Sequence, residues 1–243
     1  MVAGEQKAGE LAQRVGVDAE RGERGQCFFG ELLCQRLRGI ETEQGRVGRF
    51  LVELVGTGLL AEHGTRGFVV RAFTVDDVLD AIDVRAALEG LAARLAAERG
   101  VRSGLLAQAR ECLAQIDLVL RDSALDDETF SAYVELNGQF HKQLSEMADS
   151  AVLAREIERA ASLPFASASG FVGVEIHNAQ ARDNLVVAQH QHRQVLDAIE
   201  RREAGRAEAI MREHSRIARQ NMQVALRDPA ASGTPGVQLI RPS

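Results

Sequence analysis

Proline is nearly absent from the first 228 residues of this 243-residue chain, and this absence constrains the fold more than any other feature. Three of the four prolines lie in the last fifteen residues, and Pro164 interrupts the rest. Because proline inside a helix removes a hydrogen bond and clashes with the preceding turn, long proline-free stretches permit long helices. Ala, Leu, Glu, Arg and Gln dominate and favour helices, whereas Trp is absent and Tyr occurs once. We therefore expect a mostly helical protein.

The composition argues against several other classes of protein. Hydrophobic residues make up 45% and charged residues 26% of the chain, which is typical of globular proteins and not of disordered ones. No apolar run approaches the roughly 20 residues that span a bilayer, and the amino terminus lacks a signal-peptide pattern. The three cysteines are odd in number and lack CxxC spacing. We expect a cytoplasmic protein without a membrane segment.

Charge and periodicity divide the chain into two modules and a tail. Residues 1–73 hold ten basic and ten acidic residues, so the net charge of −6 falls entirely on residues 74–243. The first module is predicted to contain helices over 7–15 and 29–37 and a third through 47–55. Strand-like segments at 59–62 and 68–73 then flank a Gly-rich tip, a pattern that predicts a β-hairpin.

The second module begins at Thr74, where a hydroxyl cap precedes two acidic residues of a first helical turn. Apolar periodicity predicts a helix to Arg99, ended by Gly100. Further helices are expected over 103–122, 127–148, 151–163, 181–202 and 205–226. Helices of this length with short connections predict an antiparallel bundle over 74–228. Residues 229–243, rich in Pro and Gly, are expected to form a flexible tail.

Three of the six histidines are predicted to lie on the inner faces of separate helices. At 100° per residue, His141, His192 and His214 each share a face with apolar residues, and Asn137 lies one turn before His141. By the same reasoning His190 lies on the polar face, and His63 and His177 are surface or loop residues. Each buried imidazole needs a polar partner, and a single cation can serve all three. The alternatives are a metal site in the bundle interior or separate, hydrogen-bonded core histidines.

The order of these residues resembles the effector domain of GntR-family regulators of the FadR type, called the FCD domain. The resemblance is carried by Asn-x-x-Phe-His at 137–141, by HRQVLDAI after Gln191 and by AIMREH, which ends at His214. The segment DVRAALEGLAARLAA (83–97) is similar to that family's R-x-x-L-E-x-x-A-A helix. Upstream, residues 47–59 and Thr65-Arg66-Gly67 are similar to its winged helix-turn-helix and wing tip. The resemblance covers about residues 5–226.

The resemblance implies that Asn137, His141, His192 and His214 line a site for a divalent metal such as Zn or Ni. The family usually has Asp at the first of these positions, so Asn137, which lacks the negative charge, implies a weaker site. The open positions of the metal would take a small organic acid as effector. Arg85 is a candidate to pair with its carboxylate, the alternative being a structural ion pair with an acidic neighbour.

The same resemblance implies a homodimer that binds operator DNA through residues 1–73, but the recognition helix departs from the family pattern. Both usual arginines of S-R-T-P-V-R-E-A-L are replaced here, by Gln44 and Gly48. Arg46 and Arg49 lie nearby, where they are candidates for phosphate or guanine contacts or simply part of a solvated face. The candidate DNA-contacting residues are Arg36, Arg38, Gln44, Arg46, Arg49 and Arg66.

The function that this pattern favours is a ligand-responsive transcription regulator, and an enzyme is not expected. One alternative is a sensor or dimeric scaffold derived from such a regulator that no longer binds DNA, because the recognition helix departs from the family pattern. A metal-dependent enzyme is a second alternative, but the chain has no HExxH motif and no phosphate-binding loop. An acyl thioester that fills the cavity without a metal is also compatible with the pattern.

Overall fold

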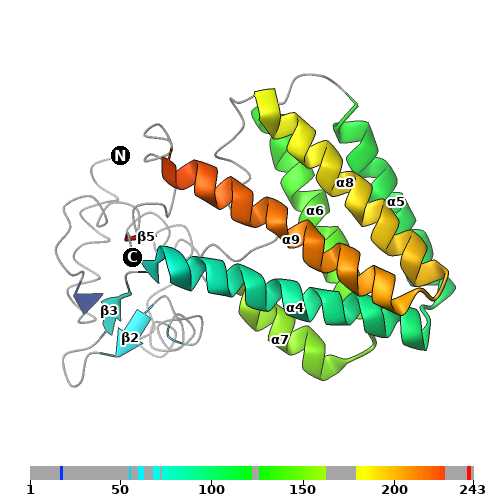
Figure 1. Cartoon of the computed structure of the whole chain (residues 1–243), viewed down its shortest axis with the longest axis horizontal. Helices are drawn as coiled ribbons and strands as arrows, with labels where there is room; N and C mark the ends of the chain where they lie inside the picture. Colours follow the sequence, from blue (N-terminus) through cyan, green and yellow to red (C-terminus); the bar gives the residue numbers. More distant parts are fainter. Residues whose placement is uncertain are drawn as a thin grey trace, which may run out of the picture. The chain divides into compact units, whose positions relative to one another are not determined.

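The computed structural model of the chain describes residues 17–18, 55, 60–62, 68–71, 73–121, 126–162, 179–227 and 240–241. The chain divides into two compact units. Unit 1 comprises Met1–Asp77 and Gly233–Ser243, and unit 2 comprises Val78–Ser232. Most of unit 2 is described and consists of helices, so the predicted mostly helical fold is confirmed (Figure 1).

The described part of unit 1 consists of short paired strands. β2 (Leu60–Glu62) and β3 (Phe68–Val70) pair antiparallel, as expected for the hairpin, with Leu60 opposite Val70. β1 (Val17–Asp18) lies parallel to β3 and was not predicted from the sequence. β4 (Phe73–Thr74) pairs in parallel with β5 (Ile240–Arg241), so the predicted tail contains a paired segment. The three helices predicted before residue 56 lie outside the described residues, apart from Val55, which is helical.

The helices of unit 2 begin and end close to the predicted residues. They are α4 (Val75–Arg99), α5 (Ser103–Val119), α6 (Asp127–Met147), α7 (Ala151–Ser162), α8 (Ala179–Glu200) and α9 (Ala204–Arg227). Thr74 caps α4 as expected, because its Oγ1 accepts from the Asp77 backbone while Asp77 Oδ2 accepts from the Thr74 backbone. Gly100 ends α4 in the left-handed region, with φ of 84°.

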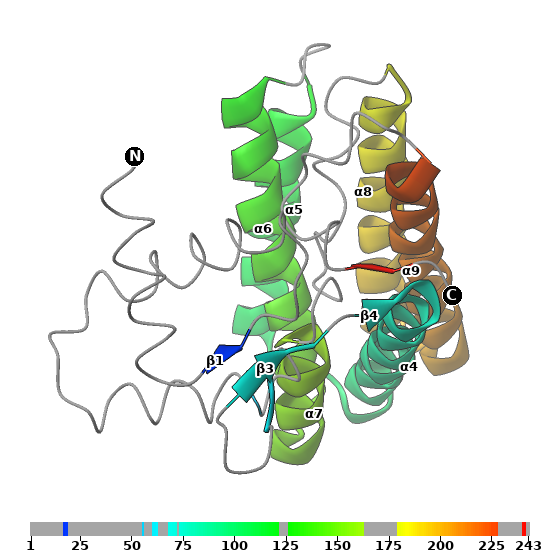
Figure 2. The ribbon, with the colours of Figure 1, turned by 90° about the vertical axis from the view of Figure 1, so that its left-hand side faces the viewer.

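The helices pack in antiparallel pairs around one hydrophobic core. α5 packs along α6 and α8 along α9, and short connections join both pairs (Figures 1 and 2). α4 runs antiparallel to α9, since Arg219 pairs with Asp83 near one end and Arg94 with Glu208 near the other. The predicted antiparallel arrangement is thus seen in these pairs. The core between them contains fully buried Ile116, Phe140, Val195 and Met211, among others.

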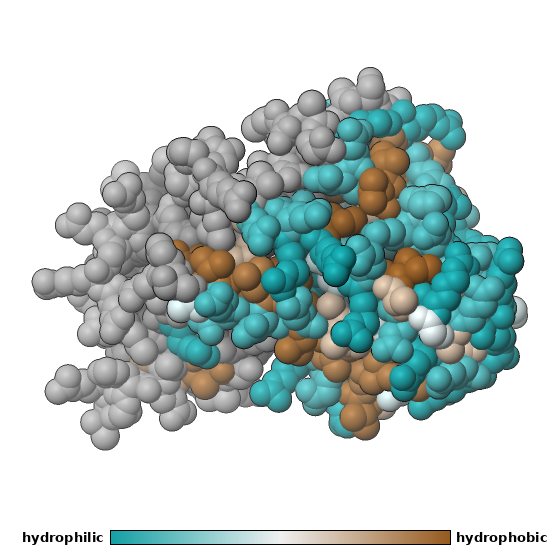
Figure 3. Space-filling view, in the orientation of Figure 1, coloured by the Kyte–Doolittle hydropathy of each residue, from teal (hydrophilic) through white to brown (hydrophobic). Residues whose placement is uncertain are grey.

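On the face that Figure 3 shows, the described helices are mostly hydrophilic, with apolar side chains in scattered groups. The exposed large apolar residues are Val84, Leu118, Val152, Val186 and Val187. Among the described residues, no helix combines the length and the apolar character that crossing a membrane requires.

Candidate metal centre

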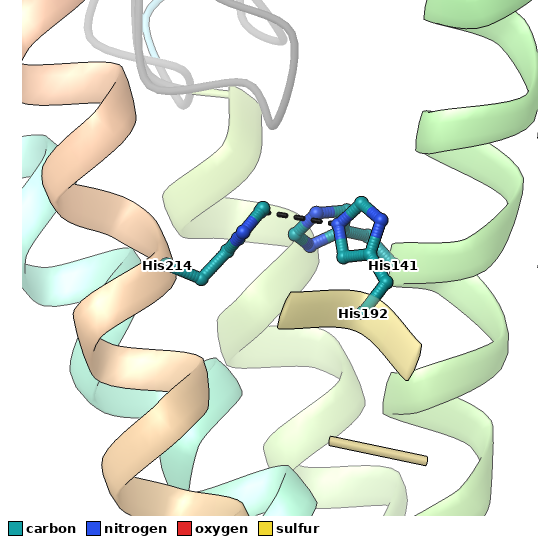
Figure 4. A group of neighbouring side chains, drawn as sticks. All are labelled: His141, His192 and His214. Atoms are coloured by element: carbon teal, nitrogen blue, oxygen red, sulfur yellow. Dashed lines mark hydrogen bonds between the residues drawn. The ribbon is translucent and has the colours of Figure 1, made fainter. Parts of the chain in front are cut away.

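Three helices each place one histidine side chain in the interior of unit 2. His141 comes from α6, His192 from α8 and His214 from α9, and all three are buried (Figure 4). Each lies on the apolar face of its helix, as the 100° spacing predicted, whereas His190 is exposed on the other face of α8. The prediction that these three imidazoles face the interior is therefore confirmed.

The ring nitrogens are spaced as ligands of one ion would be. The Nε2 atoms of His192 and His214 are 3.1 Å apart. Two nitrogens at the usual ~2.1 Å from a zinc ion reach this separation at an angle of about 95°. One nitrogen from each of the three rings lies within 4.8 Å of the others.

The outer nitrogen of each ring faces an oxygen acceptor, and this determines where the protons lie. His141 Nδ1 lies 2.9 Å from Glu89 Oε1, and His214 Nδ1 lies 3.1 Å from Gln191 Oε1. Since these oxygens only accept, a proton belongs on each Nδ1, and the inward Nε2 of a neutral ring keeps its lone pair. Buried His141 Nε2 has no hydrogen-bond partner among the described residues. When this ring is neutral, its Nε2 carries a lone pair directed into the interior, and that is the form of imidazole that can bind a metal ion.

Gln189 fixes the proton of His192 in the same way. Its Nε2 donates to Leu113 O at 2.8 Å and to Asp117 Oδ1 at 2.7 Å, so the orientation of the amide is determined. Its Oε1 therefore faces His192 Nδ1, at 3.3 Å. The Nε2 lone pairs of His192 and His214 then point toward each other at close range, an arrangement that a cation between them stabilises. The site's residues thus fit a metal ion.

Glu89, the hydrogen-bond partner of His141, also forms a buried ion pair. Glu89 Oε2 lies 2.7 Å from Arg85 Nη1, and the side chains of both residues are at most 3% exposed. Burial alone would raise the pKa of Glu89, but the charges of His141 and Arg85 and the hydrogen bonds from both outweigh it and lower that pKa to about 2. Glu89 is therefore ionised at neutral pH and accepts from both neighbours. The structure thus shows the ion pair with an acidic neighbour that was one of the two roles considered for Arg85. The other role, pairing with the carboxylate of an effector, stays a prediction.

Burial keeps the two remaining histidines neutral. Burial and the charge of His141 lower the pKa of His214 to about 3, although Glu89 opposes this. Burial, followed by the charges of His214 and His141, lowers the pKa of His192 well below its usual 6.5. Neutral imidazole is the form that binds metal, so both rings are ready to bind at physiological pH without losing a proton.

We expect the metal-free protein to lose stability as the pH falls below 6.5. The unfolded chain protonates these histidines near 6.5, whereas the folded chain resists protonation until about pH 3 at His214. A lowered histidine pKa therefore contributes stability above 6.5 that is lost progressively toward 3. Between pH 6.5 and 5.5 the free energy of unfolding should fall by about 1 to 2 kcal/mol. Urea unfolding of EDTA-treated protein measures this change. His190→Ala is the control, and its free energy of unfolding should depend on pH as that of the wild-type protein does. A free energy that stays constant over this range would contradict the assignment of neutral buried rings.

A small cavity lies beside the histidines. It measures about 20 Å³, enough for one water molecule. Asn137, Arg85 and His214 line it together with Asn221 of α9. Asn137 is 2% exposed and comes from α6, one turn from His141 as predicted. The structure thus brings together all the residues predicted for the metal and effector sites.

Glu89, Gln189 and Gln191 were not identified as site residues from the sequence. Glu89 ends the R-x-x-L-E segment, four residues after Arg85 and on the same helix face, so the motif held a signal that the periodicity argument did not use. For Gln189 and Gln191, the only sign in the sequence of a role at the site is that both lie within three residues of His192. The candidate DNA contacts lie outside the described residues; they are Arg36, Arg38, Gln44, Arg46, Arg49 and Arg66.

Comparison with known families assigns unit 2. The model of the FCD domain matches residues 80–216, which is more than half of the chain and includes every histidine of the centre. The chain belongs to the FCD-domain family. The resemblance found in the sequence is confirmed. FCD domains are the effector domains of GntR-type regulators, so the match indicates a transcription regulator and not an enzyme. No protein of curated function matches the chain.

Solved structures share the fold of this FCD protein at low sequence identity. McbR/YncC of E. coli is 18% identical, with a TM-score of 0.57 over 76% of this chain and 85% of that chain. Lar, which controls expression of the agr system of Listeria monocytogenes, is 11% identical, with a TM-score of 0.54 over 84% and 99%. A GntR-family transcriptional regulator from Pseudomonas syringae is 19% identical, with a TM-score of 0.48 over 96% and 99%. At these identities, the first two likenesses show the fold alone.

Proposed function

We propose that the protein is a ligand-responsive transcription regulator whose FCD domain senses a small organic acid at a metal centre. The observation that carries this proposal is the convergence of one ring nitrogen from each of the three histidines, with the Nε2 atoms of His192 and His214 3.1 Å apart, while each Nδ1 faces an oxygen acceptor. Scattered core histidines need no common point, whereas ligands of one ion do. The outer contacts to Glu89, Gln189 and Gln191 are of the kind that orient metal-binding histidines.

The ligands proposed for the metal are His141, His192, His214 and the amide oxygen of Asn137. Three imidazoles and a neutral oxygen suit Zn, Ni or a similar ion better than Mg or Ca, which prefer several oxygens. The ion supplies a Lewis-acidic anchor for a carboxylate. Because Asn137 carries no charge, the affinity for metal is expected to be lower than that of a site with Asp at this position.

Effector binding is proposed to change how the helices pack. The cavity of about 20 Å³ holds no more than a water, so an organic acid must move the elements around it. These elements are α4, α6, α8 and α9, and α4 extends from the boundary with unit 1 at Asp77 to the cavity at Arg85. An acid that binds the rearranged packing better shifts the population toward it, and α4 is the element proposed to carry this change to unit 1.

Operator binding by a homodimer is proposed for residues 1–73. The FCD membership and the β2–β3 hairpin, in the place of a wing, support this proposal. Two copies would bind half-sites of a palindrome, with contacts from the arginines of 36–66 named above. We propose a DNA-binding domain over residues 1–73 and a domain for effector binding and dimerisation over 74–228. Residues 229–243 are proposed to form a tail.

Fluorescence anisotropy with labelled promoter DNA tests the proposal. We expect binding that is sequence-preferring and weakens as salt is raised, and we expect its midpoint to move when metal and a small hydroxy acid are both added. Arg46→Ala and Arg49→Ala should weaken the binding, whereas Arg193→Ala, at an exposed position of α8, should not. DNA binding that neither prefers the promoter nor responds to metal and acid would count against a ligand-responsive regulator.

A sensor that no longer binds DNA is the second candidate, because the recognition segment itself departs from the family pattern. Gln44 and Gly48 stand where the family has arginines, and residues 1–73 carry no net charge. A module without net charge attracts the DNA backbone only weakly. Metal and acid binding without any DNA binding in the same anisotropy experiment would favour this candidate over the first.

A further inference from the structure

The interior of the helical unit carries one positive and one negative formal charge, and they neutralise each other. Among the described residues, Arg85 and Glu89 are the only Arg, Lys, Asp or Glu side chains that are buried. They form the 2.7 Å ion pair, so Glu89 has no charge left over for a metal ion. The other polar residues proposed as ligands bring no formal charge to a metal ion, because Asn137 is an amide and histidine binds metal as neutral imidazole.

A divalent ion held by these ligands would therefore bring two uncompensated positive charges into the interior. Uncompensated buried charge is very costly unless a counter-charge accompanies it. No carboxylate of the ligand set provides one, since position 137 is Asn and Glu89 is paired with Arg85. The counter-charge must then come with the ligand that binds next to the ion.

We propose that the effector of this protein is a small dianion, such as a hydroxydicarboxylate, in preference to a monocarboxylate. This inference rests on the proposed function, because it concerns the charge of the acid sensed at that same centre. One carboxylate would bind the ion, and the second negative charge would balance the remaining positive charge beside Arg85. A centre with a carboxylate among its ligands would need one negative charge fewer.

Two unsatisfied polar atoms on residues that line the cavity indicate where the second end of such a ligand would lie. Arg85 Nε is buried and has no hydrogen-bond partner among the described residues, and it can donate to a carboxylate. Asn221 Oδ1, on a residue that is 1% exposed, also lacks a partner there, and it can accept from a hydroxyl. Buried groups of this kind normally have partners. A carboxylate and a hydroxyl on one small molecule would supply both.

The test compares two acids that differ by a single carboxylate. Glycolate and tartronate share a 2-hydroxycarboxylate end, and tartronate carries one further carboxylate. Calorimetry on the full chain loaded with Zn²⁺ or Ni²⁺ measures both affinities near neutral pH. We expect tartronate to bind at least about tenfold more tightly. Asn137→Asp adds one negative charge at the centre and should bring this ratio down about tenfold, while metal affinity rises.

Two further variants show whether a change in acid binding comes from charge at the centre or from charge and contacts elsewhere. Gln139→Glu adds the same charge on the exposed face of α6, two residues away, and should leave the ratio unchanged. Asn221→Ala should weaken tartronate binding while metal affinity, measured by competition with a chelating dye, stays the same. The wild-type ratio tests the inference even if Asn137→Asp does not fold.

The outcomes distinguish this inference from the function on which it rests. A wild-type ratio near one, or a ratio that Asn137→Asp leaves unchanged, overturns the preference for a dianion while sensing of a carboxylate stands. If the loaded protein binds neither acid but does bind metal, sensing of a carboxylate at the metal fails, and the preference fails with it. A high ratio that falls in Asn137→Asp but not in Gln139→Glu supports both.

Discussion

Replacing Glu89 with alanine is expected to lower the free energy of unfolding by about 3 to 5 kcal/mol. The substitution leaves the Arg85 guanidinium buried at 1% exposure without its counter-ion, and breaking a buried pair on one side has this cost. His141 Nδ1 loses its acceptor as well. Urea unfolding followed by the far-ultraviolet circular dichroism of the helices measures the change.

Glu98 offers a matched control on the same helix. It pairs with Arg94 at 3.5 Å, and its side chain is 49% exposed. Because exposed ion pairs contribute little, Glu98→Ala should cost less than about 1 kcal/mol. Equal losses for the two variants would mean that the Arg85–Glu89 pair contributes no more to stability than a surface pair, and the assignment of Glu89 as the buried support of the centre would be wrong.

The second large effect concerns the metal itself. Saturating Zn²⁺ or Ni²⁺, at about 1,000 times its dissociation constant, should stabilise the wild-type protein by about 4 kcal/mol. His192→Ala should lower metal affinity by more than about 100-fold, because even changes in the outer contacts of a metal site cost 10- to 100-fold. Elemental analysis and the metal-induced shift in melting temperature measure the two effects.

His190 is the control for this substitution, since it lies on the same helix two residues away. Its side chain is exposed and contacts Gln194 at the surface. His190→Ala should therefore keep both the bound metal and the full thermal shift. If His192→Ala and His190→Ala retain metal equally, the three buried imidazoles are core histidines and the proposed centre does not exist.

The helices were predictable because their signals are local. The Thr74 cap, the stop at Gly100 and the apolar periodicity each depend on neighbours within a few residues, and the observed bounds of α4 are within one residue of the prediction. The short strands were less predictable. β1 and β5 each contain two residues and pair with distant segments, so the local sequence gives little sign of them.

The histidines were found for a related reason. Period 3.6 places His141, His192 and His214 on apolar helix faces, and a buried imidazole needs a partner wherever its helix packs. Periodicity does not predict which helix faces pack against one another. Packing of α8 against α9 brings two Nε2 atoms to 3.1 Å of each other, and the position of α4 brings Glu89 to His141.

The amino-acid sequence alone determined the helical class, the places where the helices of unit 2 begin and end, and which residues face inward. Only the tertiary structure decided that Glu89 faces His141, that Gln191 faces His214, and that Asn221 lines the cavity beside them. Helix periodicity is a property of consecutive residues. Contacts between helices depend instead on how separate helices pack, which no short stretch of sequence specifies.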